Sequence, residues 1–138
     1  MSRWRCPECD REFGRTNQSH VCVPGCTVDE CFAGRAAYQR ELYERIVADI
    51  AELGPYHADV VQVGVFLKHL RTFVEVRPKA RSLWLALVLP DPVEDPRISR
   101  RLPVSAGRVV HIVKLTTPDQ YDYQLREWLT EAYDAAGI

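Results

Sequence analysis

The stretch that decides the fold is Ser82-Leu83-Trp84-Leu85-Ala86-Leu87-Val88-Leu89. Alternate residues of a β-strand point to opposite faces, and here both alternating sets are apolar. Such a run is typical of a central strand whose two faces are both covered. Pro90, which cannot donate a ladder hydrogen bond, ends the strand. We therefore build the rest of the fold around a sheet with residues 82–89 at its centre.

Three further segments have the composition of strands. Residues 60–67 are β-branched and apolar, and we expect one strand there, with Gly64 marking a bulge. Residues 73–77 alternate and end at Pro78, which predicts a hairpin through residues 70–72. Residues 108–115 form another apolar run, whereas residues 90–107 carry four prolines and read as an irregular loop. The short connections favour an antiparallel sheet of about four strands.

Helices are expected on either side of this sheet in the chain. Thr27 and Glu30 form a capping-box pattern that predicts a short helix ending near Gly34. From residue 35 to 53, apolar residues recur every three or four positions, and Gly54-Pro55 ends this second helix. A second capping pattern at residues 117–120 predicts a last helix that ends at Gly137.

These elements predict an α+β fold. We expect an antiparallel sheet of about four strands with helices before and after it, plus a small N-terminal zinc-binding module. Residues 1–25 would form the zinc knuckle module and residues 26–138 the α+β domain. The chain has 138 residues, 46% of them hydrophobic and 27% charged, which suits one globular domain with an appendage. No apolar run approaches the ~20 residues of a membrane span and no signal peptide is evident, so we expect a cytoplasmic protein without a membrane partner.

The metal prediction rests on the cysteines. All five lie in the first 31 residues, and the odd count argues against a disulfide framework. Two residues separate Cys6 from Cys9, so one tight turn can aim both thiolates at one ion, and His20 and Cys22 could complete a tetrahedron. The other two cysteines are Cys26 and Cys31, either of which could replace Cys22; otherwise they would be free thiols.

A Cys3His set fits structural rather than catalytic Zn²⁺, because four protein ligands leave no position open for water. A segment of about 25 residues cannot bury enough apolar surface to fold alone. Zinc binding to such peptides supplies roughly 10–16 kcal/mol. Trp4 and Phe13 would pack beside the metal.

Charge is unevenly distributed although the formal net charge is −1. Residues 64–114 hold ten basic and four acidic side chains, a balance that can attract an anion. The alternative is charge that merely keeps the surface soluble. The candidate contacts to an anion or to nucleic acid are Lys68, Arg71, Arg77, Lys79, Arg81, Arg108 and Lys114.

Three functions follow from these features. The first is a zinc-stabilised binding module that contacts nucleic acid through residues 64–114, and the alternative is a regulatory protein-interaction module that meets an acidic partner. The third is a nuclease-associated or metal-dependent hydrolase domain, because Asp59 with Glu75-Val76-Arg77 imitates a magnesium-nuclease pattern. Arginine stands where that pattern needs lysine, so we expect no catalytic residues and a binding protein rather than an enzyme. Nucleic-acid sheets also need exposed aromatic rings, but we expect the strand aromatics Phe66, Phe73 and Trp84 to pack in the core.

Two parts of the sequence resemble known ones. The run from Trp4 to Phe13, with Asn17-Gln18-Ser19-His20-Val21-Cys22, resembles a bacterial zinc-finger-like N-terminus. Residues 65–68, 72–79 and 131–133 resemble a domain of unknown function, similar to the C-terminal part of chains filed as predicted transport proteins. The resemblance implies zinc on Cys6, Cys9, His20 and Cys22, and no established activity. Asp10 stands where such knuckles usually have glycine.

Overall fold

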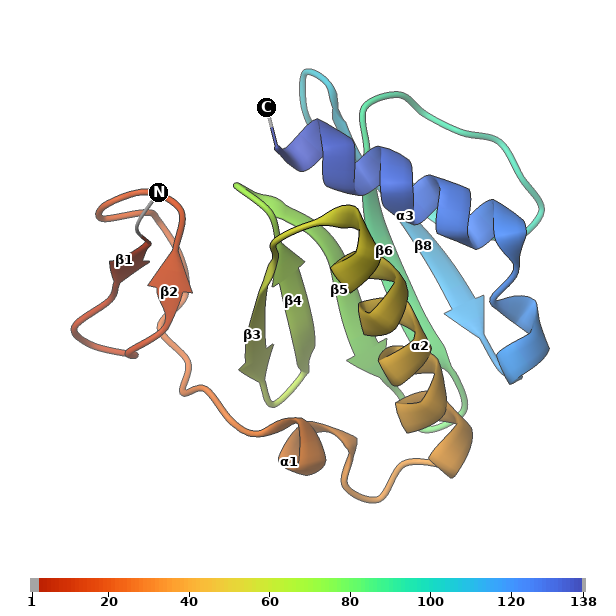
Figure 1. Cartoon of the computed structure of the whole chain (residues 1–138), viewed down its shortest axis with the longest axis horizontal. Helices are drawn as coiled ribbons and strands as arrows, with labels where there is room; N and C mark the ends of the chain where they lie inside the picture. The colour runs from red at the N-terminus through yellow and green to blue at the C-terminus, as the bar shows by residue number, and fades with distance from the viewer. Residues whose placement is uncertain (1–2, 138) are drawn as a thin grey trace.

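The structure, a computed structural model, describes residues 3–137 and consists mostly of β-sheet (Figure 1). Residues 1–2 of the predicted zinc knuckle module and residue 138 of the predicted α+β domain lie outside the described residues. A two-stranded sheet pairs β1 (Trp4–Arg5) with β2 (Glu12–Phe13). The main sheet contains β3 (His57–Val61), β4 (Gly64–Lys68), β5 (Thr72–Pro78), β6 (Leu83–Leu89), β7 (Ile98–Ser105) and β8 (Arg108–Leu115). The helices are α1 (Val28–Phe32), α2 (Ala37–Leu53) and α3 (Tyr123–Ala136), with a 3-10 turn η1 (Pro118–Gln120) before α3.

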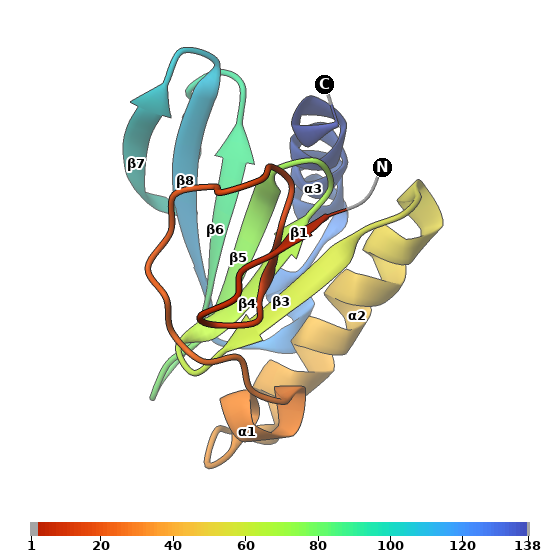
Figure 2. The ribbon, with the colours of Figure 1, turned by 90° about the vertical axis from the view of Figure 1, so that its left-hand side faces the viewer.

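The predicted fold class is wrong. The main sheet has six antiparallel strands in the order β3-β4-β5-β6-β8-β7, not about four. Helices precede and follow the main sheet in the chain, and in space α2 and α3 both lie on one of its faces (Figures 1 and 2). The prediction of β6 as an inner strand is correct, since β6 pairs with β5 on one side and β8 on the other.

Two strands were missed for different physical reasons. Residues 60–67 contain a turn: Val61 pairs with Gly64, so a two-residue loop at Gln62-Val63 divides β3 from β4, and Gly64 begins β4 rather than forming a bulge. An apolar turn without the usual Asn-Gly signature looks like continuous strand. Residues 98–105, expected to be loop, form β7, an edge strand with register shifts and Pro103. Prolines and charges of this kind are common on edge strands because they block further pairing.

The helices and one face of the main sheet enclose the hydrophobic core. Leu83, Leu85, Leu87 and Leu89 of β6 are fully buried against this core. Because residues alternate along a strand, Trp84, Ala86 and Val88 lie on the opposite face, where all three are half-buried. We call this second side the open face of the main sheet. Of the two faces of β6 that were expected to be covered, the leucine face is fully buried and the other is buried only in part.

Helix ends follow the sequence patterns with one difference. Thr27 and Glu30 form the expected capping box at the start of α1. Thr117 and Gln120 also form a capping box, but it opens only η1, and α3 begins after Asp122, whose carboxylate accepts the Leu125 N–H. Within residues 3–137, no helix is both long and apolar enough to cross a membrane.

Candidate metal centre and the open sheet face

The hairpin of β1 and β2 brings together the four residues expected to bind metal. The ligand atoms of Cys6, Cys9, His20 and Cys22 all lie within 4.8 Å of one another. His20 Nε2 is 3.4 Å from the Cys9 sulfur and 3.3 Å from the Cys22 sulfur. The Cys6 and Cys22 sulfurs are 3.7 Å apart. This group could therefore hold one metal ion.

The imidazole of His20 is oriented as a ligand. Its Nδ1–H donates to the carbonyl oxygen of Gln18 at 2.7 Å, which leaves the lone pair of Nε2 directed at the cysteines. Metal-binding histidines commonly fix their second nitrogen in this way. The ring stacks on Phe13 with centroids 3.9 Å apart, and Trp4 meets it edge-on at 6.0 Å. The small apolar cluster expected beside the metal is thus present.

The turn between Cys6 and Cys9 prepares the first sulfur for a cation. Asp10 takes a left-handed conformation with φ of 62°, and its N–H donates to the carbonyl oxygen of Cys6. Aspartate tolerates this conformation better than most residues, which explains how it replaces the usual glycine. Hydrogen bonds from the backbone N–H groups of Cys9 and Glu8 lower the pKa of the Cys6 thiol to about 6.

The crowded sulfurs favour a bound cation. Desolvation of the Cys22 sulfur and the proximity of Cys6 and Cys9 raise the pKa of the Cys22 thiol to about 12. Three thiolates this close repel one another unless a positive ion lies among them. The donor set of three sulfurs and one imidazole also matches the preference of zinc. The residues present therefore fit the ion that their spacing predicts.

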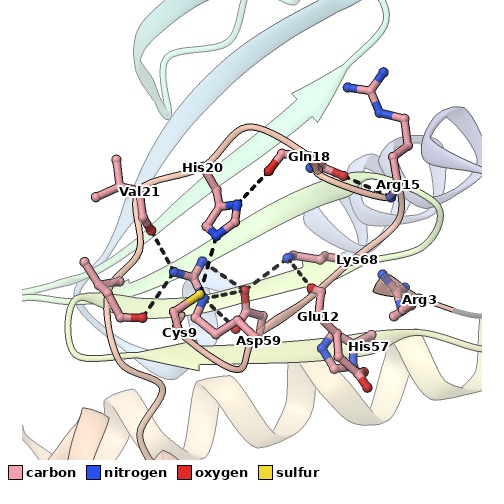
Figure 3. A network of polar contacts seen from close by, with 12 residues as sticks. Arg3, Cys9, Glu12, Arg15, Gln18, His20, Val21, His57, Asp59 and Lys68 are labelled. Atoms are coloured by element: carbon pink, nitrogen blue, oxygen red, sulfur yellow. Dashed lines mark hydrogen bonds and ion pairs between the residues drawn. The ribbon is translucent and has the colours of Figure 1, made fainter. Parts of the chain in front are cut away.

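A buried ionic cluster attaches the hairpin to the main sheet (Figure 3). Arg11, next to β2, donates from Nε to both carboxylate oxygens of Asp59 on β3 at 3.1 Å. Lys68 on β4 donates to Asp59 at 3.0 Å and to the backbone carbonyl of Glu12 at 3.2 Å. The side chains of Arg11, Asp59 and Lys68 are only 7%, 4% and 6% exposed. We call these three residues the docking triad.

Burial, hydrogen bonds and a neighbouring aromatic ring all affect the charged groups of the docking triad. Burial opposes ionisation of Asp59, but hydrogen bonds from Arg11 and Lys68 outweigh it and lower the pKa of the carboxyl group. Burial lowers the pKa of Lys68 despite the attraction of Asp59. The ammonium group also lies 4.3 Å from the centre of the Phe13 ring, a favourable cation–π distance. Arg11 donates in addition to the carbonyl oxygen of Val21, the residue before the candidate ligand Cys22.

Other candidate residues remain outside this centre. Cys26 and Cys31 are free thiols and do not join the metal group. Asp59 and Glu75, the two carboxylates of the nuclease-like pattern, face Phe66 from opposite sides and are thus separated by strand β4. Asp59 belongs to the docking triad, and Glu75 pairs with Arg77 at 2.8 Å. In residues 3–137, no second group of three metal-binding side chains is found.

The seven basic residues predicted to contact an anion or nucleic acid lie in three places. Lys68 is buried in the docking triad. Arg71 and Arg108 lie at one end of the sheet, where they donate to the carbonyl oxygens of Ala135 and Thr72. Burial and the charge of Arg71 lower the pKa of Arg108. The other four are near the start of β6, and they are Arg77, Lys79, Arg81 and Lys114.

Trp84 is the functional candidate that sequence reasoning assigned to the core. In the register of the sheet it lies directly between Arg77 on β5 and Lys114 on β8, on the open face. The Nζ atoms of Lys114 and Lys79 are 4.6 and 4.8 Å from the centre of its indole ring. Phe73 is fully buried, as expected, and Phe66 is half-buried near Arg11. Only the alternation within residues 82–89 hinted that Trp84 faces away from the leucines.

Fold and site together define a small antiparallel-sheet protein whose sheet carries helices on one face and a Cys/His hairpin on part of the other. Residues 28–136 match the family model described as Domain of unknown function (DUF5655). The chain therefore belongs to the DUF5655 family. The metal group lies outside the matched residues, and the match carries no transport description. No curated protein and no solved structure matches the chain.

Proposed function

We propose that this protein is a zinc-stabilised binding module that contacts nucleic acid through the open face of its main sheet. Cys6, Cys9, His20 and Cys22 would hold a structural Zn²⁺, which supplies folding free energy to a hairpin with little apolar surface. The hairpin covers β3 and β4 through the docking triad. The rest of the open face is left for a ligand.

The observation that carries the proposal is the row Arg77–Trp84–Lys114 across three neighbouring strands. Lys79, Arg81 and Lys114 form no ion pair with any carboxylate among residues 3–137. Unpaired cations next to an accessible aromatic ring suit a ligand that offers both phosphates and flat bases. An acidic protein would use the cations but not the ring, so nucleic acid is the better match.

Salt-dependent binding tests this proposal. We would measure the fluorescence anisotropy of labelled single-stranded and duplex oligonucleotides at several salt concentrations. If the three unpaired cations each contact a phosphate, log K should fall with log salt with a slope of about −2 for a single strand. This slope corresponds to about 15-fold weaker binding at 200 mM than at 50 mM salt.

Matched variants separate this surface from general charge. Lys79→Gln with Lys114→Gln leaves one of the three cations and should make the salt slope for a single strand shallower, at about −0.7. Arg35→Gln with Arg126→Gln removes the same charge from exposed positions on the helical side and should leave the slope unchanged. Binding to neither nucleic acid, or a slope that the two lysines do not affect, would refute the proposal. An acidic peptide that binds with the same salt dependence would instead favour the protein-interaction alternative.

A further inference from the structure

The open face holds an aromatic ring in a fixed orientation, with movable cations above it. Trp84 has a fixed orientation, because its indole N–H donates to the Ser82 hydroxyl at 2.9 Å. The two ammonium groups over its ring belong to flexible lysine side chains, which can move aside without any change in the backbone. A flat group could thus replace them on the ring while they turn towards a phosphate.

Beyond Trp84, the open face is apolar and continuous along two paired strands. Ala86 and Val88 on β6 lie beside Ile112 and Val110 on β8, and all four are half-buried. Glu75, on β5 beside Ala86, is the acidic residue of this row, and its carboxylate is neutralised by Arg77. We call the four half-buried apolar residues the apolar floor. No unpaired carboxylate from β5, β6 or β8 lies beside it.

A second cationic group closes the far end of this floor. Arg108 lies on the same strand as Lys114, six residues away, which corresponds to about 20 Å in an extended chain. Arg71 lies close to Arg108, but its guanidinium donates to the carbonyl oxygen of Ala135 on α3 and so belongs to the helical side. Arg108 forms no ion pair with a carboxylate among the described residues. The surface thus has cations at both ends and apolar side chains between them.

On the basis of the proposed function, we infer that the ligand is single-stranded nucleic acid, with one unpaired base stacked on Trp84 and the strand following β6 and β8 towards Arg108. A duplex hides the faces of its bases inside the stack and offers only phosphates and groove edges. A single strand exposes base faces, which stack on aromatic rings and lie on apolar surface. The apolar floor between the two cationic ends is of use only to the second kind of ligand.

The test compares strand with duplex in the full chain and in Trp84 variants. Anisotropy would be measured with a labelled single strand of about 12 nucleotides and with the duplex of the same sequence. We expect tighter binding of the single strand. Trp84→Leu should weaken binding of the strand by roughly 5- to 150-fold, the range of one base–aromatic stack, and leave binding of the duplex unchanged. Trp84→Phe keeps an aromatic ring and should lose less than Trp84→Leu.

Control variants keep the result interpretable. Tyr123 on α3 is 66% exposed and has Arg126 over its ring, so Tyr123→Leu removes a comparable pair from the helical side and should not affect binding. If Trp84→Leu lowers the melting temperature, strand binding by Trp84→Phe is compared with wild type instead. Weaker binding of the strand with unchanged binding of the duplex then supports the inference. Equal binding of strand and duplex with no effect of Trp84 would overturn this inference and leave the proposed function standing. Salt-dependent binding to neither ligand would overturn both.

Discussion

Replacing Asp59 by asparagine should release the hairpin of β1 and β2, with its candidate metal ligands, from the main sheet. The substitution keeps the shape of the side chain but removes its charge. Arg11 and Lys68 would then remain buried without a counter-ion, at side-chain exposures of 7% and 6%. Removing one partner of a buried ion pair typically costs about 3–5 kcal/mol. We expect this loss to weaken the docking of residues 3–25 on the main sheet. Arg11 belongs to that segment, and Lys68 donates to the carbonyl oxygen of Glu12 within it.

The docking free energy should be linked to metal affinity. If the ion binds the docked hairpin better than the free one, a 3 kcal/mol loss can weaken the apparent zinc affinity by up to about 150-fold. The assay is competition with a chromophoric chelator, combined with amide hydrogen exchange in residues 3–25. Glu75→Gln is the matched control: it removes a carboxylate from the same sheet face, but its partner Arg77 is partly exposed, so the effect should stay within about 1 kcal/mol.

A second variant guards against simple unfolding. Replacing all three members of the docking triad with apolar residues of similar size removes the unpaired charges, and such replacements are often neutral or stabilising. Arg11→Met, Asp59→Leu and Lys68→Met together should therefore recover much of the zinc affinity lost in Asp59→Asn. Unchanged zinc affinity and exchange protection in Asp59→Asn would refute the docking role of the triad.

Three further predictions follow from the structure. A Cβ on Gly14 would lie 2.5 Å from the backbone oxygen of Leu70, whereas a Cβ on Gly25 meets nothing closer than 3.5 Å. In thermal denaturation, Gly14→Ala should therefore destabilise the docked hairpin by about 1–3 kcal/mol and Gly25→Ala should be tolerated; equal melting curves would contradict the close approach. Removing the metal with a chelator should abolish exchange protection in residues 3–25 while the circular dichroism of α2 and α3 persists, and loss of both together would show that the sheet needs the metal. Burial, followed by the hydrogen bond to Asp49, raises the pKa of Tyr121 above its ordinary value. The folded state therefore holds the phenolic proton more tightly than the unfolded state. The stability that the protonated phenol contributes is present below about pH 10 and is lost as the pH rises further. Tyr121→Phe should accordingly lose less stability than wild type between about pH 9 and 11, and identical pH profiles would contradict this assignment.

The metal group could be predicted from sequence because its geometry is local. A Cys-x-x-Cys turn and a His-x-Cys pair each fix the relative positions of two ligands within four residues or fewer, and only the return of the hairpin had to be assumed. The docking triad could not be predicted in the same way. Arg11 is 48 residues from Asp59 in the chain, and the three residues look like ordinary surface charges until the hairpin packs on β3 and β4.

The errors in the fold also have physical causes. Hydrophobicity identifies strands that are buried, so it located β6 and β8 but not β7, an edge strand whose residues are mostly exposed. The same signal cannot say which face of an apolar strand the helices will cover. Trp84 was expected in the core for this reason, although its neighbours Leu83 and Leu85 are the residues that are fully buried.

Cys6, Cys9, His20 and Cys22 are close enough to hold one metal ion, and the proposed hairpin structure depends on that ion. Elemental analysis of the chain purified without chelators tests metal binding most directly, with Cys9→Ser and Cys26→Ser compared side by side. We expect one zinc per chain in wild type and in Cys26→Ser, and loss of zinc in Cys9→Ser. Absence of metal from wild type, or equal zinc in the two variants, would contradict the account.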